Sequence, residues 1–364
     1  MSKTKLILVG GFLAAGKTTM LNTIAGRLTK RGFNVGLITN DQAADLVDTA
    51  ILTCTGVEVR EVSGSCFCCN FPGFMAAIQS LTDAGCDLIV AEPVGSCTDL
   101  SATILQPVKD KFADLDLAPL TVLVDPVRLK EALELVPSLT HPDALYIVKR
   151  QLEEADRILL NKADTLTPAQ IEEELALLKR NFSAPSSAAS ALQGTAVDAW
   201  LDEILSGGSA GTHITEVDYD RYAHGEAVLG WLNATIELDG AADTDWIVFA
   251  EALLTNLRDA FRADNAEIGH VKLSLDCGGK TVLGNVGAIG GPVKMRGESG
   301  VKGASAKMTL NARAQMSPEA LQKAVEAILP KTAASFGISA RIANLKCLMP
   351  GRPNPTYRYQ TVIG

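Results

Sequence analysis

A glycine-rich segment near the start of the chain constrains the fold more than any other part of the sequence. It reads Gly11-Phe-Leu-Ala-Ala-Gly16-Lys17-Thr18, directly after an apolar run and directly before an amphipathic stretch. Glycines in such a connection let successive backbone N–H groups approach an anion closely, and the following helix adds the positive end of its dipole. The pattern therefore predicts a phosphate-binding loop between a strand and a helix.

The residue types in this loop indicate how a nucleotide would be held. Lys17 can reach the β- and γ-phosphates, and the Thr18 hydroxyl is a typical Mg²⁺ ligand. The backbone N–H groups of the loop would bind the remaining phosphate oxygens. The residues predicted to bind the nucleotide here are Gly11, Ala14, Ala15, Gly16, Lys17, Thr18 and Thr19.

A second segment, Asn161-Lys162-Ala163-Asp164, directly follows a predicted strand over 157–160. The Asp164 carboxylate can accept two hydrogen bonds from N1 and N2 of guanine, a donor pattern that adenine lacks. Asn161 would hold O6 or N7 of the base or tether the neighbouring loops, and the stem of Lys162 would pack along the base. A plain turn at a strand end is the alternative. The position downstream of a phosphate loop favours GTP as the nucleotide.

Glu92 ends another predicted strand, over 87–91, and is followed by Pro93, Val94 and Gly95. A carboxylate at this point is a typical direct or indirect Mg²⁺ partner, and the Gly95 N–H could sense the γ-phosphate. A solvated glutamate at a strand end is the alternative. With Lys17 and Thr18, these two residues form the predicted catalytic group.

Cys66, Cys68 and Cys69 place three thiols within four residues, after a predicted strand over 57–62. Thiolates this close repel one another unless they are protonated, oxidised or neutralised by a soft or borderline cation such as Zn²⁺, Co²⁺ or Ni²⁺. Asp41, Cys97, a water or a partner's ligand could fill a fourth position. Buried core thiols and a redox-active pair are the two alternatives to a metal site.

Apolar runs alternate with amphipathic segments through the first half of the chain. Runs such as LILV, DLIV and LTVLV lack alternation, as strands covered on both faces require. The predicted strands are 5–9, 34–39, 57–62, 87–91, 120–124 and 157–160, and the predicted helices are 17–30, 72–83, 127–135, 144–155 and 168–180. Residues 1–205 are therefore predicted to form an α/β P-loop NTPase domain with a mostly parallel sheet.

The second half differs in its pattern. A small, polar segment over 206–212 is a predicted linker. Beyond it, the alternation over 232–238 predicts strands with one solvated face. The order β-α-β-β-(β)-α-β over 213–364 predicts a smaller α+β domain, ferredoxin-like with an added strand, that binds partner or cargo.

Two further groups of polar residues, one basic stretch and the four histidines, are considered as candidate functional residues. A glycine-rich stretch with Lys294, Arg296 and Lys302 could contact an anionic cofactor or partner, although a mobile hairpin is the commoner explanation. The four histidines show no i,i+4 pair and no clustering with carboxylates along the chain, which predicts structural or exposed roles. They are His141, His213, His224 and His270.

The composition excludes several classes of protein. The net charge of −9 argues against a nucleic-acid binder, which needs a clustered excess of Lys and Arg. Eight unevenly spaced cysteines are too few for a disulfide scaffold of this length. Because no apolar stretch reaches about 18 residues, no membrane span is expected. These features predict a cytoplasmic protein with reduced thiols.

The motifs and their order resemble those of one family, the CobW-type GTPases, a branch of the P-loop maturation GTPases. The resemblance rests on the phosphate loop, Asn40-Asp41, the Cys66–Cys69 cluster, Glu92-Pro-Val-Gly and Asn161-Lys-Ala-Asp, and it covers residues 1 to about 205. It implies phosphate and Mg²⁺ roles for Lys17 and Thr18, switch roles for Glu92 and Gly95, and guanine selection by Asn161 and Asp164. It also implies that the three clustered cysteines are metal thiolates. Asp41 falls where this family usually has glutamate.

The resemblance implies a metal-linked GTPase that acts as a metallochaperone or maturation factor for a client metalloenzyme or corrinoid protein. GTP would order the loops Asp41–Cys69 and Glu92–Asp99, and hydrolysis would release the metal, with a GTP-dependent homodimer as a further possibility. No arginine finger or catalytic glutamine can be assigned, which predicts slow intrinsic turnover. The alternatives are a G-protein chaperone or reactivator of a corrinoid-dependent enzyme or methyltransferase, and a non-enzymatic redox or metal-sensing module.

Overall fold

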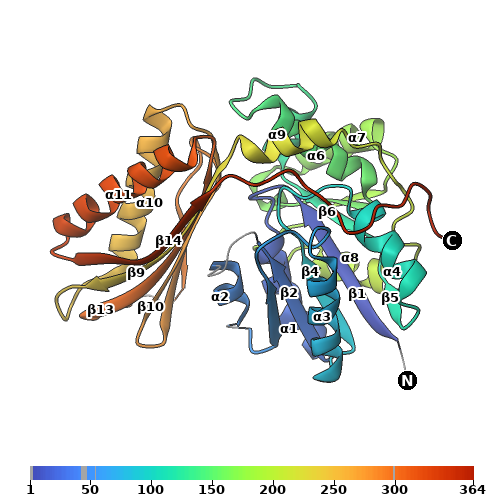
Figure 1. Ribbon diagram of the computed structural model, residues 1–364, viewed down its shortest axis with the longest axis horizontal. Helices are drawn as coiled ribbons and strands as arrows, with labels where there is room; N and C mark the ends of the chain where they lie inside the picture. The colour runs from blue at the N-terminus through green and yellow to red at the C-terminus, as the bar shows by residue number, and fades with distance from the viewer. Residues whose placement is uncertain (1–2, 42–46, 54, 298–299) are drawn as a thin grey trace.

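The computed structural model describes residues 3–41, 47–53, 55–297 and 300–364, which form two lobes with one sheet each (Figure 1). Part of the loop expected to respond to GTP, residues 42–46, lies outside the described residues, as does Cys54.

The first lobe is built on an eight-stranded sheet in which every strand pair is parallel. Its strands are β1 (Thr4–Gly11), β2 (Val35–Asn40), β3 (Glu58–Val62), β4 (Leu88–Glu92), β5 (Leu115–Leu117), β6 (Thr121–Val124), β7 (Arg157–Leu160) and β8 (Ser186–Ala188). They lie in the order β3-β2-β4-β1-β6-β7-β8, and β5 pairs with β1. The order places the carboxyl ends of β1, β3, β4 and β7, which carry the motifs, at one edge.

Helices cover both faces of this sheet. The helices of the lobe are α1 (Lys17–Lys30), α2 (Val47–Thr53), α3 (Phe71–Asp83), α4 (Gln106–Lys111), α5 (Pro126–Ala132), α6 (Pro142–Glu154), α7 (Pro168–Asn181), α8 (Val197–Leu205) and α9 (Tyr219–Ala227). A π-helical turn (Ser101–Leu105) precedes α4, and a 3₁₀ turn (Ala163–Thr165) follows β7.

The uninterrupted apolar run of β1 follows from this double cover. Leu6 and Leu8 pack into a core with α3 and α6, whereas Ile7 and Val9 point to the other face and pack with α1 and α8. Successive side chains of a strand point to opposite faces, so a strand covered on both sides needs apolar residues at every position. The predicted α/β fold with a mostly parallel sheet is confirmed.

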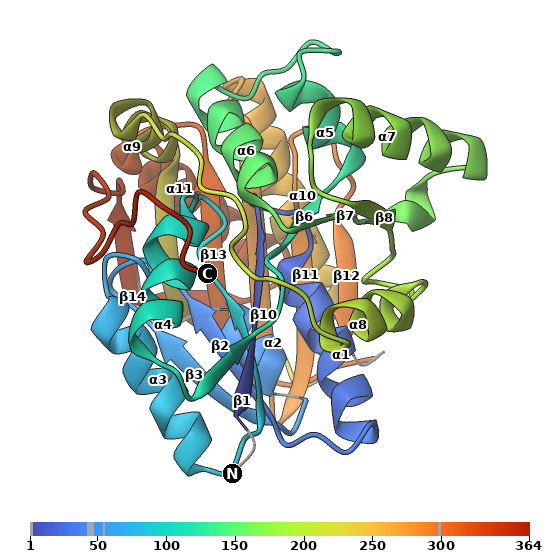
Figure 2. The ribbon, with the colours of Figure 1, turned by 90° about the vertical axis from the view of Figure 1, so that its right-hand side faces the viewer.

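The second lobe is a six-stranded antiparallel sheet with two helices on one face (Figures 1 and 2). Its elements are β9 (Gly230–Asp239), α10 (Trp246–Ala263), β10 (Ile268–Cys277), β11 (Lys280–Val286), β12 (Lys294–Gly297), β13 (Ser305–Ala314), α11 (Pro318–Ser335) and β14 (Ser339–Leu348). The strand order is β12-β11-β10-β13-β9-β14. The four neighbouring strands β10-β13-β9-β14 have the order of a ferredoxin-like sheet. Strands β11 and β12 extend this sheet by two strands, where the sequence predicted one.

Two segments outside this sheet pack on the first lobe. Helix α9 lies against α6, and its Tyr222 is buried in the core of the first lobe. At the other end, the chain after β14 crosses back, and the Tyr359 N–H donates to the Ala102 carbonyl (3.0 Å). Figure 1 shows this segment in red, ending near α4. The first lobe therefore includes residues that precede the second sheet in the sequence and residues that follow it.

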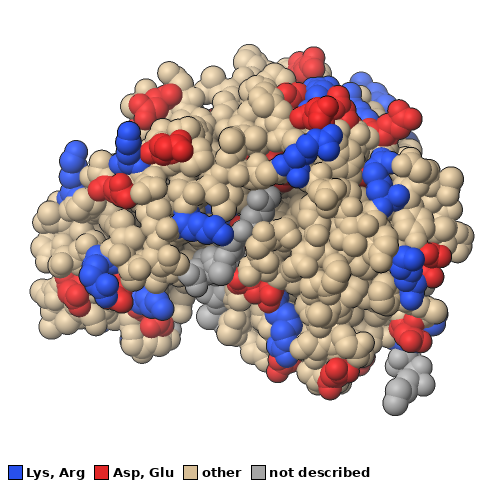
Figure 3. All heavy atoms as spheres, in the orientation of Figure 1, with Lys and Arg blue, Asp and Glu red and all other residues tan. Residues whose placement is uncertain are grey.

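Charged side chains of both signs are scattered over both lobes on the face drawn in Figure 3, and no continuous basic tract crosses that face. Within the described part of the chain, no helix combines the length and the apolar character that crossing a membrane requires.

Candidate functional site

The phosphate loop lies between β1 and α1, and two of its glycines are required by geometry. Gly11 has φ 131°, and a Cβ there would lie 2.4 Å from the Leu123 carbonyl oxygen. Gly16 has φ 99°, and its Cβ would lie 2.3 Å from Nδ2 of Asn161. A larger residue would strain the backbone and strike the neighbouring strand ends, so the loop can turn this tightly only with glycine.

Lys17, Thr18 and Glu92 come together at the start of α1. The Lys17 ammonium donates to the Gly11 carbonyl oxygen (2.8 Å) and lies 3.9 Å from Oε1 of Glu92. The Thr18 hydroxyl donates to the same Glu92 oxygen (3.1 Å). The structure thus brings both loop residues to the predicted carboxylate. Gly95 lies beside them, since a Cβ there would be 3.0 Å from the Lys17 nitrogen.

Burial sets the protonation of this group. Burial, together with the neighbouring Asp48, raises the pKa of Glu92 to about 7. Burial also lowers the pKa of Lys17, although Glu92 opposes this effect. Oε2 of Glu92 is buried and has no hydrogen-bond partner among the described residues. An uncompensated carboxylate oxygen of this kind is suited to a cation.

Asp48 is a site residue that the sequence did not indicate. It lies on α2 and interacts with the Thr18 hydroxyl, while both of its oxygens accept from the Lys272 ammonium (2.7 and 2.8 Å). Two carboxylates and a hydroxyl therefore meet beside the phosphate loop. Hard oxygen donors of this kind are the ligands that Mg²⁺ prefers, so the residues present fit this ion.

At the opposite end of the loop, Asn161 connects two loops. Its Nδ2 donates to the Ala15 carbonyl oxygen (2.8 Å), and its Oδ1 accepts from the Ala191 N–H (2.9 Å). Asn161 is therefore engaged in tethering the loops, one of the two roles considered for it. The Asp164 carboxylate accepts from the Ser190 hydroxyl (2.5 Å). Ser190 and Ala191 were not identified from the sequence, because their small side chains are typical of a spacer.

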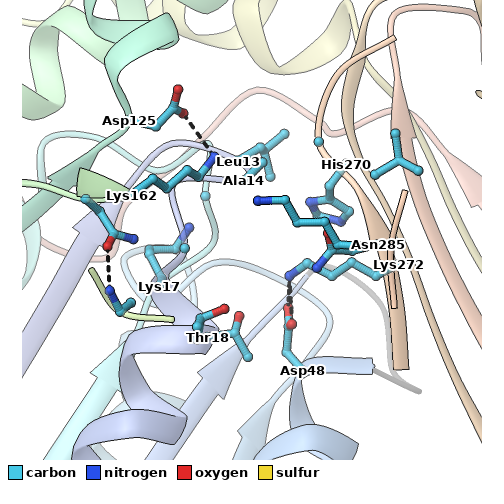
Figure 4. Close-up of a pocket in the computed structure, with 18 of the residues that line it drawn as sticks. Leu13, Ala14, Lys17, Thr18, Asp48, Asp125, Lys162, His270, Lys272 and Asn285 are labelled. Carbon is cyan, nitrogen blue, oxygen red and sulfur yellow. Dashed lines mark hydrogen bonds and ion pairs between the residues drawn. The ribbon is translucent and has the colours of Figure 1, made fainter. Parts of the chain in front are cut away.

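Lys162 has a left-handed backbone (φ 61°), which turns its side chain toward the pocket. Its ammonium lies 3.6 Å from Oδ2 of Asp125, the residue that caps α5 by accepting from the N–H of Val127 and Arg128. Figure 4 shows this pair and the pair formed by Asp48 and Lys272, both facing the pocket.

These residues line a cavity of about 620 Å³ between the two lobes. The phosphate loop, Glu92, Asn161 and Asp164 lie on one side, and the second sheet forms the other. Figure 4 shows Lys17 and Thr18 of the first lobe facing His270 and Lys272 of the second sheet. The second sheet and its loops contribute a set of polar side chains, which are His270, Lys272, Asn285, Lys294 and Arg296. Arg296 reaches Thr19 on α1, with Nη1 3.5 Å from the hydroxyl oxygen. The cavity is thus shared between the lobes.

The three clustered cysteines lie between β3 and α3. The Sγ atoms of Cys66 and Cys68 are 3.1 Å apart, and those of Cys68 and Cys69 are 3.8 Å apart. The three ligand atoms are close enough together to hold one metal ion. Hydrogen bonds from Cys68, Cys69 and Cys97 keep the pKa of the Cys66 thiol well below its usual range. Cys97, one of the fourth ligands considered, lies close enough to influence the Cys66 thiol, but it is not among the three thiols whose sulfur atoms all lie within 4.8 Å of one another.

Asp41, also considered as the fourth metal ligand, is engaged elsewhere. Its two carboxylate oxygens accept from Nη2 of Arg313 on β13 (3.0 and 2.8 Å), and the Arg313 side chain is almost completely buried. The pair joins the carboxyl end of β2 to the second sheet. The structure therefore places Asp41 at a contact between the lobes.

The chain that follows β14 covers the cysteine cluster. The Asn354 N–H donates to Sγ of Cys69 (3.2 Å), and the Thr356 N–H donates to the Cys68 carbonyl oxygen (2.8 Å). Beyond them, the Arg358 guanidinium bonds to the buried Asp99 (2.6 Å). This strap, residues 349–364, could not be anticipated from its sequence, which carries no strong pattern.

Two of the histidines do meet a carboxylate, contrary to the expectation from their spacing. His224 bonds to Asp143 (2.7 Å), and the rings of His141 and His224 are 4.8 Å apart. Arg221 also binds Asp143 (2.9 Å). The histidines come from α9 and from the N-cap of α6, which lie side by side only in the fold. His141 and Asp143 are only two residues apart in the sequence, and the fold brings the distant His224 to them.

Comparisons with known proteins give a matching family model and two curated relatives. A family model described as "CobW/HypB/UreG, nucleotide-binding domain" matches residues 5–187. Two curated relatives come from Escherichia coli (strain K12). The zinc chaperone YjiA is 26% identical over 195 residues, which cover 51% of this chain and 57% of YjiA. The zinc chaperone YeiR is 30% identical over 170 residues, which cover 45% of this chain and 48% of YeiR. The chain spans about half the length of these relatives.

A solved structure, the Zn(II)-bound YjiA GTPase from Escherichia coli, is 19% identical and aligns with 90% of this chain and 99% of its own, with a TM-score of 0.39.

Proposed function

This chain belongs to the CobW/HypB/UreG family, and on that premise we propose that it is a Mg²⁺-dependent GTPase acting as a metallochaperone. GTP binding and hydrolysis would control a thiolate site that carries Zn²⁺, or Co²⁺, to a client metalloenzyme. Curated relatives that are zinc chaperones support Zn²⁺ as the cargo. The free thiols of the described cysteines suit a reducing compartment such as the cytoplasm.

One observation carries this proposal: a single short loop lies beside both candidate sites. Glu92, which accepts from the Thr18 hydroxyl of the phosphate loop, ends β4, and five residues later the loop that follows carries Cys97 next to the thiol cluster. The Gln151 side chain holds the loop by donating to the Gly95 and Cys97 carbonyl oxygens (3.0 and 2.7 Å). A displacement of the loop at the phosphate end would therefore reach a metal ligand.

The nucleotide would occupy the cavity between the lobes. Phosphate oxygens would accept hydrogen bonds from the loop N–H groups and from Lys17, and Asp164 would accept from N1 and N2 of guanine. The Thr18 hydroxyl, with Glu92 and Asp48, would hold Mg²⁺, which when bound neutralises charge on the β- and γ-phosphates.

The metal cargo would bind Cys66, Cys68 and Cys69, with Cys97 as the fourth ligand. Four sulfur ligands make a closed tetrahedral site, whereas three leave a position open for transfer. Because Cys97 lies on the loop that begins at Glu92, GTP binding would change the position of this fourth ligand. A change from four ligands to three is a physical means of switching from holding the metal to releasing it.

The test is a metal titration with and without a non-hydrolysable GTP analogue. Because coupling is reciprocal, the factor by which the analogue changes Zn²⁺ affinity must equal the factor by which Zn²⁺ changes analogue affinity. Serine at all three clustered cysteines is expected to abolish tight Zn²⁺ binding, and Cys277→Ser, at an isolated thiol of the second lobe, serves as the control. Equal Zn²⁺ affinities with and without nucleotide would exclude the coupling.

A further inference from the structure

The second lobe forms one wall of the nucleotide cavity and places cations in it. Lys272 lies on β10 and Arg296 on β12, and both line the same cavity as the phosphate loop. Figure 4 shows Lys272 on the side of the cavity opposite Lys17. The family match ends at residue 187, before this lobe begins. The two cations are therefore additions to the site by a part of the chain that the family model does not describe.

Lys272 lies at the Mg²⁺ end of the cavity. Its ammonium bonds to both oxygens of Asp48, and the side chains of this pair are only 18% and 19% exposed. Asp48 in turn interacts with the Thr18 hydroxyl. Lys272 is also close enough to Lys17 for their charges to interact. The ammonium therefore lies where the terminal phosphate of a bound triphosphate is expected.

Arg296 lies toward the end of the cavity where the base is expected. Its Nη1 is 3.5 Å from the Thr19 hydroxyl oxygen, in the first turn of α1, and it is close enough to Asp164 for their charges to interact. Thr19 follows the Mg²⁺-binding Thr18, and Asp164 is the residue expected to bind guanine. The guanidinium therefore lies between the inner phosphates and the base.

Given GTP binding as proposed above, we propose that the second lobe completes the nucleotide site, with Lys272 binding the terminal phosphate and Arg296 the base-proximal end of the nucleotide. In the structure, Asp48 and Lys272 neutralise each other. When GTP binds, Asp48 can turn to Mg²⁺ and Lys272 to the γ-phosphate, so that no buried charge loses its partner. GDP lacks the phosphate that would draw Lys272 away from Asp48.

The contact between the lobes then depends on the nucleotide. Asp48 holds Lys272 in the absence of a third phosphate, and the γ-phosphate replaces this contact with one of its own. Lys272 therefore distinguishes GTP from GDP, whereas Arg296, at the other end, contacts features that both nucleotides share.

The experiment measures the affinities of full-length variants for fluorescent GTPγS and GDP. Lys272→Gln keeps a donor for Asp48 but no charge, so the lobes can still dock. It is expected to weaken GTPγS binding about 10- to 100-fold and GDP binding less than about threefold, because charge-assisted hydrogen bonds to a phosphate contribute this much. Arg296→Gln is expected to weaken both to a similar extent. Lys307→Ala, at an exposed lysine of the same sheet, is the matched control.

Equal losses for GTPγS and GDP in Lys272→Gln would overturn the terminal-phosphate role and leave Lys272 as a docking residue. No loss in Arg296→Gln would overturn the second contact. Melting temperatures without nucleotide separate both outcomes from misfolding. A wild-type protein that binds no guanine nucleotide would instead contradict the proposed function, so failures of the two proposals are distinguishable.

Discussion

At the scale of single residues, the protonation of Glu92 would control cation binding at the proposed phosphate site. Its carboxylate is buried between Thr18 and Lys17, and its pKa is raised to about 7, well above the usual value for a glutamate. The protonated form is neutral and binds cations poorly. A divalent cation must therefore displace a proton from Glu92 at any pH below about 7.

The consequence is a pH-dependent magnesium requirement. We expect the Mg²⁺ affinity of the GTPγS complex to fall by up to about tenfold per pH unit below pH 7, because one proton is released for each ion bound. Above pH 7 the affinity should become nearly constant. Glu92→Gln should bind Mg²⁺ weakly at every pH. Titrations of Mg²⁺ between pH 5.5 and 8.5 measure this, and a flat wild-type profile would contradict the assignment.

Cys97 gives a second prediction at this scale. Cys97→Ser should lower Zn²⁺ affinity at least tenfold through loss of a ligand, and it should also remove the effect of GTPγS on that affinity. Cys69→Ser should weaken binding but keep the nucleotide effect, because Cys69 is not on the Glu92 loop. Competition with a chromophoric chelator measures both. If Cys97→Ser keeps a full nucleotide effect, the loop does not transmit it.

Some residues of the candidate site can be predicted from the sequence, and others cannot. Lys17, Thr18, Asn161 and Asp164 belong to contiguous patterns whose spacing is set by one turn of backbone, so they could be named in advance. Asp48 can be recognised as a site residue only through its pairing with Lys272, which lies 224 positions away in the sequence. No local pattern encodes a pair of this kind, because only the packing of the two lobes brings it together.

At the scale of elements, the strap over residues 349–364 protects the thiol cluster. Tyr357 packs edge-on against Phe71 of α3, with ring centroids 5.2 Å apart, and Arg358 pairs with Asp99, which is 1% exposed. These contacts hold the Asn354 N–H against Cys69.

Removing these anchors should expose the thiols. In metal-free protein, Tyr357→Ala combined with Arg358→Ala is expected to speed modification of Cys69 by Ellman's reagent about tenfold or more, because local opening becomes easier. Arg352→Ala is the control, since Arg352 lies on the same strap, where it pairs with the exposed Asp220 and lies over the Tyr219 ring. An unchanged modification rate in the double variant would show that the strap does not shield the cluster.

Elements with strong periodicity were predictable, and short ones were not. The predicted strands of the first lobe lie within two residues of the observed bounds, because apolar runs of a doubly covered sheet stand out in the sequence. The predicted helix over 127–135 ends early, at Ala132, followed by a left-handed Glu134 (φ 57°). Helices α2 and α9 are too short to show a hydrophobic period, and tertiary contacts hold them instead.

At the scale of the whole molecule, the polar face of the second sheet lies against the first lobe, whereas the sequence predicted that it would face solvent. Alternation along β9 predicts a solvated face, yet Asn233 and Thr235 on that face are only 5% and 9% exposed. This face lies toward the first lobe, where Asn311 accepts from the Val47 N–H (2.8 Å) at the start of α2. A polar strand face indicates contact with water or with polar groups, and the sequence alone does not distinguish them.

In the proposed complex the nucleotide bridges the two lobes, which predicts a difference in amide exchange. GTPγS should slow hydrogen exchange both in the phosphate loop and in β10 to β12, because Lys272 and Arg296 would then bind the nucleotide from these strands. GDP should protect the phosphate loop and leave β10 less protected, since Lys272 has no third phosphate to bind. In Lys272→Gln the two nucleotides should protect β10 equally. Hydrogen exchange followed by mass spectrometry measures all three states. Identical protection of β10 by GTPγS and GDP in the wild type would mean that the second lobe does not respond to the third phosphate.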